Sequence, residues 1–386
     1  MEHFISKIQI EKLRHLENLN IILSDNQRQH LLLTGKNGSG KTSLLENLSN
    51  CLKAAVMNKV PNPGKIFGNE KFLREVANNG VKIDFNFVED LEKIFSVGEY
   101  ILAYFPANRK ANISLANGVE NIKLNDNYDI DKDPAKNLIK YMVHLKTQQA
   151  YARQENDSKV ETDIQNWFDR FENALKILLE DTTLKLEYYY KNYNFLIHQA
   201  GRLPFGFNEL SDGYSSVIQI MSGILLRMEQ NWLLKGTLSE YNLEGIVLID
   251  ELETHLHIEL QRKILPFLTE FFPRVQFIIS THSPYILTSV SNATIFDLEK
   301  KVTFNDMSQY SIDNVAEAYF DSEDYSVELE KKFTEYKILL DKTDPTDEER
   351  IRRAELRTEL KNINGTLSAR IKNEFEELET RRKANG

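Results

Sequence analysis

Apolar and polar residues along the first third of the chain follow two periods, which predict short strands and one early helix. Residues 30–34 form a compact apolar run that ends at a glycine, which is typical of a buried central strand. Apolar residues at helical spacing over residues 44–56 predict a helix soon after that glycine. Further strands are predicted where Ile8 and Ile10 begin a run and over residues 19–23, 81–87 and 100–105.

The middle of the chain continues the alternation of strands and helices. An irregular stretch rich in Asn and Asp precedes two helical patterns, over residues 134–153 and 159–179. Aromatic residues on the second helix could stack on bases, but their spacing favours a packed helix face. A strand pair, a helix from about Tyr214 to Gln230, an apolar strand at 245–249, a helix ending near Phe272 and a strand at 275–280 follow. This order predicts an α/β sheet with its chemistry at the strand ends.

The same patterns divide the chain into three parts. We expect residues 1–110 and 181–320 to form one α/β head, and residues 111–180 to form an irregular and helical insertion in it. Residues 321–386 carry amphipathic patterns with nearly balanced charge, which predict a helical hairpin. Its apolar face could pack on its own core or form a docking surface for a partner.

Composition narrows the possible classes of protein. The 48 basic and 58 acidic residues give a net charge of −10, which argues against a surface that grips nucleic acid everywhere but allows a local basic groove. The single cysteine, Cys51, excludes an internal disulfide framework and fits a reducing compartment. No apolar run approaches the roughly 18 residues that span a bilayer. We therefore expect a soluble, cytoplasmic protein without a membrane partner.

A complete phosphate-binding loop follows the central strand. Its sequence is Gly35-Lys36-Asn37-Gly38-Ser39-Gly40-Lys41-Thr42, between a predicted strand and a predicted helix. Glycines let the backbone curl so that successive N–H groups and the helix N-terminus face phosphate. Lys41 is expected to reach the β- and γ-phosphates of ATP, and the Thr42 hydroxyl to bind Mg²⁺. The expected nucleotide-binding residues are Gly35, Asn37, Gly38, Ser39, Gly40, Lys41, Thr42 and Ser43.

A second acidic motif completes this site. Apolar residues 246–249 form a predicted buried strand, and Asp250 and Glu251 follow directly. Asp250 is expected to hold magnesium directly or through water, and Glu251 to act as the general base on the attacking water. The pattern alone is weak, but its pairing with the phosphate loop makes it specific.

Further motifs resemble those of the ABC-type ATPase family. Leu210-Ser211-Asp212-Gly213-Tyr214 resembles the family signature, with Asp212 in place of the usual second glycine. Glu253-Thr254-His255-Leu256-His257 lies at the position of the D-loop, and His282 at that of the switch histidine. With the two ATP motifs, these follow the family's order from the N-terminal strand to about residue 298. We therefore expect an ABC-type head, a P-loop NTPase sheet with flanking helices.

The resemblance implies a reaction that one subunit cannot complete. In the family, two heads enclose two ATP molecules, and the signature of each caps the γ-phosphate held by the other. This implies a nucleotide-dependent homodimer in which Ser211 and Gly213 act on the partner's ATP and His282 acts on its own. The opening of the chain also resembles SMC/RecF-type heads, in which an arginine at the position of Arg14 approaches the nucleotide.

Residues 250–257 and 280–284 resemble most the ATPases of bacterial anti-phage systems, which include OLD-type enzymes and the PtuA ATPases of Septu systems, some associated with retrons. The resemblance implies regulation of a separate effector, a nuclease or a toxin. Residues 329–378 or the insertion could contact that effector. DNA or a retron RNA–DNA species is a further possible partner.

Several alternatives remain open from the sequence. A RecF-like repair ATPase would bind DNA, and an ATP-locked scaffold would hold nucleotide with negligible turnover. The family's Q-loop glutamine is absent after the strand at 100–105, and Asn108, Arg109, Gln148 or Gln149 could take its place. His255, His257 and His282 could form a metal cluster, although we favour the D-loop and switch interpretation.

Overall fold

The computed structural model describes residues 2–56, 80–87, 91–109, 112–120, 128–229, 242–312, 315, 327–342, 345–362 and 375–380. The chain forms two compact units, Met1–Ile312 and Asp313–Gly386. Residues 321–326, 363–374 and 381–386 of the predicted C-terminal region lie outside the described residues.

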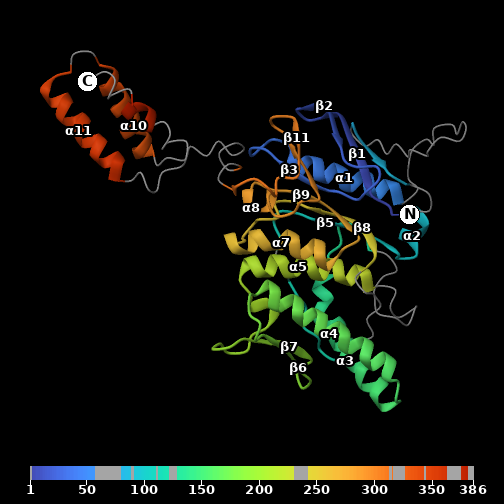
Figure 1. The fold of residues 1–386 in the computed structure, drawn as a ribbon. Helices are drawn as coiled ribbons and strands as arrows, with labels where there is room; N and C mark the ends of the chain where they lie inside the picture. The colour runs from blue at the N-terminus through green and yellow to red at the C-terminus, as the bar shows by residue number, and fades with distance from the viewer. Residues whose placement is uncertain are drawn as a thin grey trace, which may run out of the picture. The chain divides into compact units, whose positions relative to one another are not determined.

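A six-stranded sheet forms the centre of the first unit (Figure 1). Five strands are parallel, and the sixth strand, which forms one edge of the sheet, pairs antiparallel with its neighbour. The central strands are buried along their whole length, which explains their continuous apolar runs. Across the sheet, the order is β11 (Val302–Asn305), β10 (Ala293–Asp297), β3 (His30–Thr34), β9 (Val275–Ser280), β8 (Glu244–Ile249) and β5 (Tyr100–Phe105).

A smaller antiparallel sheet is built from local connections near the N-terminus. Strand β1 (Ile5–Leu13) lies between β2 (Leu16–Ile22) and β4 (Val81–Phe85). Helix α1 (Lys41–Val56) shares one hydrophobic cluster with strands of both sheets, so the helix that follows the phosphate loop is held in the core. This packing fixes the direction in which the helix N-terminus points.

Helices cover the other side of the central sheet, and the insertion and the β-hairpin that follows it lie beyond those helices (Figure 1). Helix α5 (Asp212–Met228) packs against β5, and Figure 1 places α5 between the central sheet and the insertion. The aromatic rings of the second insertion helix are buried, as the predicted packed face requires: Trp167 stacks on Phe171, and Phe168 stacks on Phe195 of the hairpin. The remaining elements are α2 (Leu91–Ser96), η1 (Pro134–Asn137), α3 (Leu138–Gln154), α4 (Ser158–Leu178), β6 (Lys185–Tyr189), β7 (Asn194–His198), η2 (Phe207–Glu209), α7 (Ile258–Phe271) and α8 (Pro284–Leu287).

This is the predicted α/β class. The predicted order of strands and helices is confirmed from β1 to β9, except for the short helix α2, which was not predicted. The sequence pattern did not predict β10 and β11, because Thr294 interrupts the apolar residues of β10 and β11 is mostly exposed, so neither leaves a strong apolar period. None of the helices among the described residues is long and apolar enough to cross a bilayer.

The second unit has a small core of its own. Helices α10 (Val327–Asp341) and α11 (Asp347–Asn362) pack together with a helical turn at 375–380. Thr346 and Glu349 form a reciprocal capping box at the start of α11, as their spacing indicates. The apolar positions therefore face a shared core, which consists of Phe333, Tyr336, Leu339, Leu356, Leu360, Phe375 and Leu378.

Candidate ATP site

The phosphate loop connects the end of β3 to the first turn of α1. Gly35, Gly38 and Gly40 adopt φ values of +123°, +84° and +98°, which side chains rarely tolerate. A Cβ atom at Gly40 would also lie 3.0 Å from Leu16 Cδ1. These glycines therefore let the loop curl, and Gly40 packs closely against Leu16 of β2.

Lys41 places its ammonium inside this loop. Its Nζ donates to the carbonyl oxygens of Gly35 at 2.6 Å and Lys36 at 3.1 Å, and the residue is 5% exposed. Burial lowers the pKa of Lys41, while the nearby charges of Glu251, Glu253 and Asp250 oppose this shift. The loop thus holds a cation where phosphate oxygens would enter.

Two expected magnesium ligands lie side by side although they are distant in sequence. The Thr42 hydroxyl donates to Asp250 Oδ2 at 2.8 Å. Ser280, at the end of β9, donates its hydroxyl to Asp250 Oδ1 at 2.5 Å. Asp250 is 1% exposed, so both carboxylate oxygens are fixed in a buried position at the ends of neighbouring strands.

Glu251 follows in a strained backbone conformation. Its φ of +46° lies in the left-handed region, which costs a non-glycine residue about 1–2 kcal/mol. Its N–H donates to Ser280 Oγ at 2.7 Å, and its carbonyl accepts from Arg109 Nη2 at 2.8 Å. Ser280 therefore holds Asp250 and Glu251 at once, a role that sequence analysis did not assign.

His282 lies beyond β9, and Glu253 controls its position. The His282 N–H donates to Glu253 Oε1, and His282 Nε2 is a buried atom without a hydrogen-bond partner in the described part of the chain. Burial and the charge of Lys41 lower the pKa of His282, so its imidazole is neutral at pH 7. Burial raises the pKa of Glu253. The sequence indicated that Glu253 lies in the D-loop, but not that its carboxylate accepts the His282 N–H.

The signature motif begins α5 and packs on the D-loop of the same chain. Ser211 is the N-cap residue and makes no side-chain capping bond. A Cβ atom on Gly213 would lie 2.5 Å from the carbonyl oxygen of His255. The close contact between Gly213 and the His255 backbone of the same chain therefore leaves no room for a side chain at position 213.

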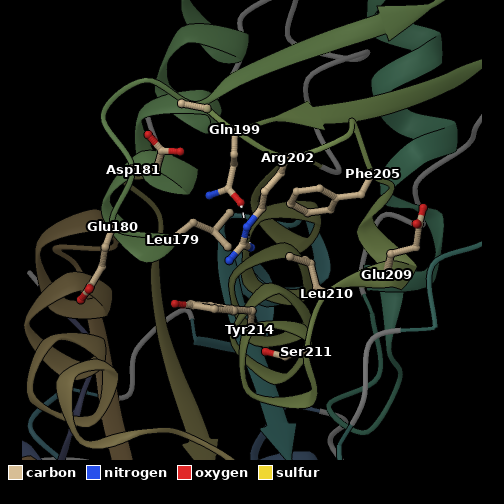
Figure 2. A pocket seen from close by; sticks show the side chains of 11 residues that line it. Leu179, Glu180, Asp181, Gln199, Arg202, Phe205, Glu209, Leu210, Ser211 and Tyr214 are labelled. Carbon is tan, nitrogen blue, oxygen red and sulfur yellow. Dashed lines mark hydrogen bonds between the residues drawn. The ribbon is translucent and has the colours of Figure 1, made fainter.

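A cavity of about 570 Å³ adjoins the signature (Figure 2). Its walls come from the end of the insertion, the turn after β7 and the start of α5. Figure 2 shows Arg202, Gln199 and Tyr214 around this space, with Ser211 at its lower edge. The insertion and the signature therefore share one wall. The lining residues are Leu179, Glu180, Asp181, Gln199, Ala200, Arg202, Phe205, Glu209, Leu210, Ser211 and Tyr214.

The turn between β1 and β2 reaches the phosphate loop through His15. His15 Nε2 lies 3.2 Å from the carbonyl oxygen of Ser39. Arg14 is an exposed turn residue with a φ of +53°. The expected approach of Arg14 to a bound nucleotide stays a prediction.

The structure also separates the remaining candidates. Gln149 Nε2 donates to Gln165 Oε1 at 3.0 Å, within the α3–α4 pair of the insertion. Arg109 lies behind Asp250 and Glu251, against their backbone. His257 caps α7 through Leu260 N–H, and the described residues contain no group of three or more His, Cys, Asp or Glu side chains that could hold a metal.

Comparisons with known proteins support the resemblance seen in the motifs. Residues 114–288 match the family model described as "AAA domain, putative AbiEii toxin, Type IV TA system". The chain is 23% identical over 392 residues to Septu protein PtuA of Bacillus mycoides (strain KBAB4), covering 95% of this chain and 51% of that protein. It is 44% identical over 87 residues to the Retron Vc95 probable ATPase of Vibrio cholerae serotype O1 biovar El Tor, covering 22% and 16%.

Among solved structures, the SMC head domain from Thermotoga maritima has a TM-score of 0.37 and 15% identity, and the match covers 77% of this chain and 94% of that one. The chain spans about half the length of the PtuA relative and less of the retron relative. The matches to PtuA and to the retron ATPase confirm the expected similarity to Septu and retron ATPases.

Proposed function

We propose that this chain binds and hydrolyses ATP at the site formed by the phosphate loop, Thr42, Asp250 and Glu251. The observation that carries the proposal is the contact of Thr42 with Asp250, two residues from separate motifs whose side chains meet at 2.8 Å. The ammonium of Lys41 lies in the adjacent loop and supplies positive charge for the β- and γ-phosphates.

The donor set fits magnesium. Thr42 and Asp250 offer a hydroxyl and a carboxylate oxygen, which are the hard oxygen ligands that Mg²⁺ prefers alongside phosphate oxygens. Bound there, the ion would neutralise charge that develops on the phosphates. Ser280 keeps the Asp250 carboxylate oriented, because its hydroxyl donates to the second oxygen.

Glu251 and His282 take the roles in proton transfer and γ-phosphate contact. The Glu251 carboxylate accepts a proton from the attacking water as general base. A neutral His282 can donate from Nε2 to a γ-phosphate oxygen, since Nε2 has no partner among the described residues. Glu253 supports this role by holding the His282 backbone.

A second copy of the chain completes the site in this proposal. Ser211 is exposed at the N-terminus of α5, where the helix dipole favours an anion. Closure of two copies would bring Ser211 and Gly213 to the γ-phosphate held by the partner. ATP binding would then favour the dimer, and hydrolysis would release it.

The similarity to PtuA and retron ATPases supports a role in bacterial anti-phage defence. In this proposal the ATPase acts in the cytoplasm and controls a separate effector, a nuclease or a toxin. The insertion shares a cavity wall with the signature, so an effector bound to the insertion could sense the ATP state.

Native mass spectrometry with ATP and Mg²⁺ tests the proposal, on protein expressed with its flanking genes. Wild type and Glu251→Gln would be compared, with phosphate release measured in parallel. We expect Glu251→Gln to lower hydrolysis at least about 100-fold and to accumulate an ATP-bound dimer, with or without a second polypeptide attached. A monomer of Glu251→Gln at saturating ATP would contradict the dimer. Wild-type protein that retains ATP without phosphate release would contradict hydrolysis.

A further inference from the structure

The guanidinium of Arg109 lies behind the acidic motif and contacts its backbone. Arg109 follows β5 and is 3% exposed. Its Nη1 donates to the carbonyl oxygen of Asp250 at 2.5 Å, and its Nη2 donates to those of Glu251 at 2.8 Å and Leu252 at 3.1 Å. One side chain thus gathers the carbonyls of three consecutive residues at the end of β8.

The same guanidinium also reaches the signature helix. Arg109 Nε donates to the hydroxyl of Ser216 at 2.8 Å, and Ser216 lies in the first turns of α5. Nη1 donates in addition to the carbonyl of Pro106 at 3.0 Å, within the loop that carries Arg109 itself. Three segments therefore meet at one cation: the loop after β5, the end of β8 and α5.

The guanidinium of Arg109 is suited to holding the backbone through hydrogen bonds. Burial lowers the pKa of Arg109 to about 10, so the group remains charged at pH 7. Its five bonds go to carbonyl and hydroxyl oxygens, which match the planar fork of a guanidinium. A lysine could supply at most three bonds from a single point and could not reproduce this fork.

Glu251 has particular need of such support. A residue with φ of +46° keeps that conformation only where its surroundings impose it. Ser280 holds the Glu251 N–H, and Arg109 holds its carbonyl. The direction of the Glu251 side chain depends on both bonds.

We propose that Arg109 is a positioning residue for ATP hydrolysis: it fixes the Glu251 backbone and ties the acidic motif to the signature helix through Ser216. The loop after β5 thus contacts the backbone of Asp250 and Glu251 through Arg109. A test of this inference by ATP hydrolysis rests on the proposed function. A test by amide exchange of the backbone does not.

Arg227 supplies a matched control. It is 2% exposed, lies on the same helix α5, and has a pKa lowered by burial to about 10. Its guanidinium also bonds to backbone carbonyls, including those of Leu102 at 2.9 Å, Gly223 at 3.0 Å and Ile130 at 3.2 Å. These contacts join α5 to β5 and to the base of the insertion, so Arg227→Lys perturbs packing without touching residues 250–252.

The experiment compares Arg109→Lys, Arg227→Lys and Ser216→Ala in the full-length chain. Steady-state ATP hydrolysis, binding of a fluorescent ATP analogue, thermal unfolding, and amide exchange of residues 250–256 are measured for each. Arg109→Lys is expected to lower kcat by roughly 100-fold with KM within about threefold of wild type. It should also speed amide exchange in residues 250–256. Ser216→Ala should lower kcat by a smaller factor, with KM likewise retained.

Arg227→Lys should leave kcat, KM and exchange in that segment within about twofold of wild type, even where its thermal midpoint falls as far as that of Arg109→Lys. Equal kcat losses in the two lysine variants, or loss of ATP-analogue binding by Arg109→Lys, would overturn the inference. If wild type released no phosphate, the proposed function would fail. Amide exchange would still decide whether Arg109 positions Glu251.

Discussion

The hydroxyl of Thr42 and the carboxylate of Asp250 lie 2.8 Å apart, joining the first turn of α1 to the end of β8. Three strands of the sheet contribute to this contact, because β3 leads into α1 and β9 supplies Ser280 between them. The pair is the point at which phosphate and metal chemistry would meet, so it is the most direct place to test the site.

Replacing Thr42 by valine should remove a magnesium ligand while keeping the side-chain volume. We expect ATP hydrolysis to fall at least about tenfold and to require more Mg²⁺, because a single buried carboxylate would carry the ion. Hydrolysis titrated with Mg²⁺ measures both effects. Thr34→Val is the control, since the Thr34 hydroxyl is buried without a hydrogen-bond partner in the described residues. A Thr42→Val variant with the Mg²⁺ dependence of wild type would exclude Thr42 as a ligand.

Ser280→Ala should destabilise the fold as well as the site. It leaves the Glu251 N–H without its acceptor and deprives the Asp250 carboxylate of a donor. An unfolding free energy lower by about 2 kcal/mol is expected from such a loss in a buried position. Urea denaturation measures it, and Ser222→Ala is the comparison, because the buried Ser222 hydroxyl has no partner among the described residues. Equal losses for the two alanine variants would refute the special role of Ser280.

Gly213→Ala should reveal the intramolecular role of the signature glycine. The new Cβ would meet the His255 carbonyl oxygen at 2.5 Å, and we expect an overpacking cost of about 1–3 kcal/mol. Thermal unfolding without nucleotide separates this effect from any loss of dimer closure. Gly118→Ala, where nothing lies within 4 Å of the added atom, should change the unfolding free energy by less than about 0.5 kcal/mol. An unchanged Gly213→Ala monomer would assign the glycine to the partner's ATP alone.

Protonation of His30 should lower the free energy of unfolding in mild acid. Burial lowers its folded-state pKa to about 4, and its Nδ1 accepts the Phe277 N–H at 3.1 Å, which requires the neutral ring. A depressed histidine pKa gives full stability above the unfolded pKa of about 6.5, and this stability is lost as the pH falls towards 4. The free energy of unfolding should drop by about 2 kcal/mol between pH 7.5 and pH 5 from this group alone. His30→Asn should flatten that part of the pH profile, and an unaltered slope would argue against it.

The sequence predicts much of this site because its motifs stand at strand ends. Parallel strands bring their carboxyl ends to one edge, so Thr42 and Asp250 could be placed together before any register was known. Ser280 and Arg109 could not be assigned in this way. Their partners depend on the alignment of β8 with β9 and on the path of the loop after β5, and neither alignment nor path leaves a local pattern.

The contact between His15 and the phosphate loop could not be predicted either. His15 Nε2 meets the Ser39 carbonyl oxygen across the turn between β1 and β2, and that contact depends on the path of the turn, which leaves no local sequence pattern. The prediction of a buried face on α4 is confirmed, because helical spacing alone determines which residues lie on the same side of a helix.

The order of strands in the central sheet also has a consequence for synthesis of the chain. Strand β3 and its phosphate loop leave the ribosome early, but its two neighbours β9 and β10 are encoded more than two hundred residues later. The small sheet of β1, β2 and β4 can close from nearby segments, whereas the nucleotide site waits for almost the whole first unit to emerge. The edge of the sheet that carries Thr42, Asp250 and Ser280 therefore assembles only after β9 has emerged, late in the synthesis of the first unit.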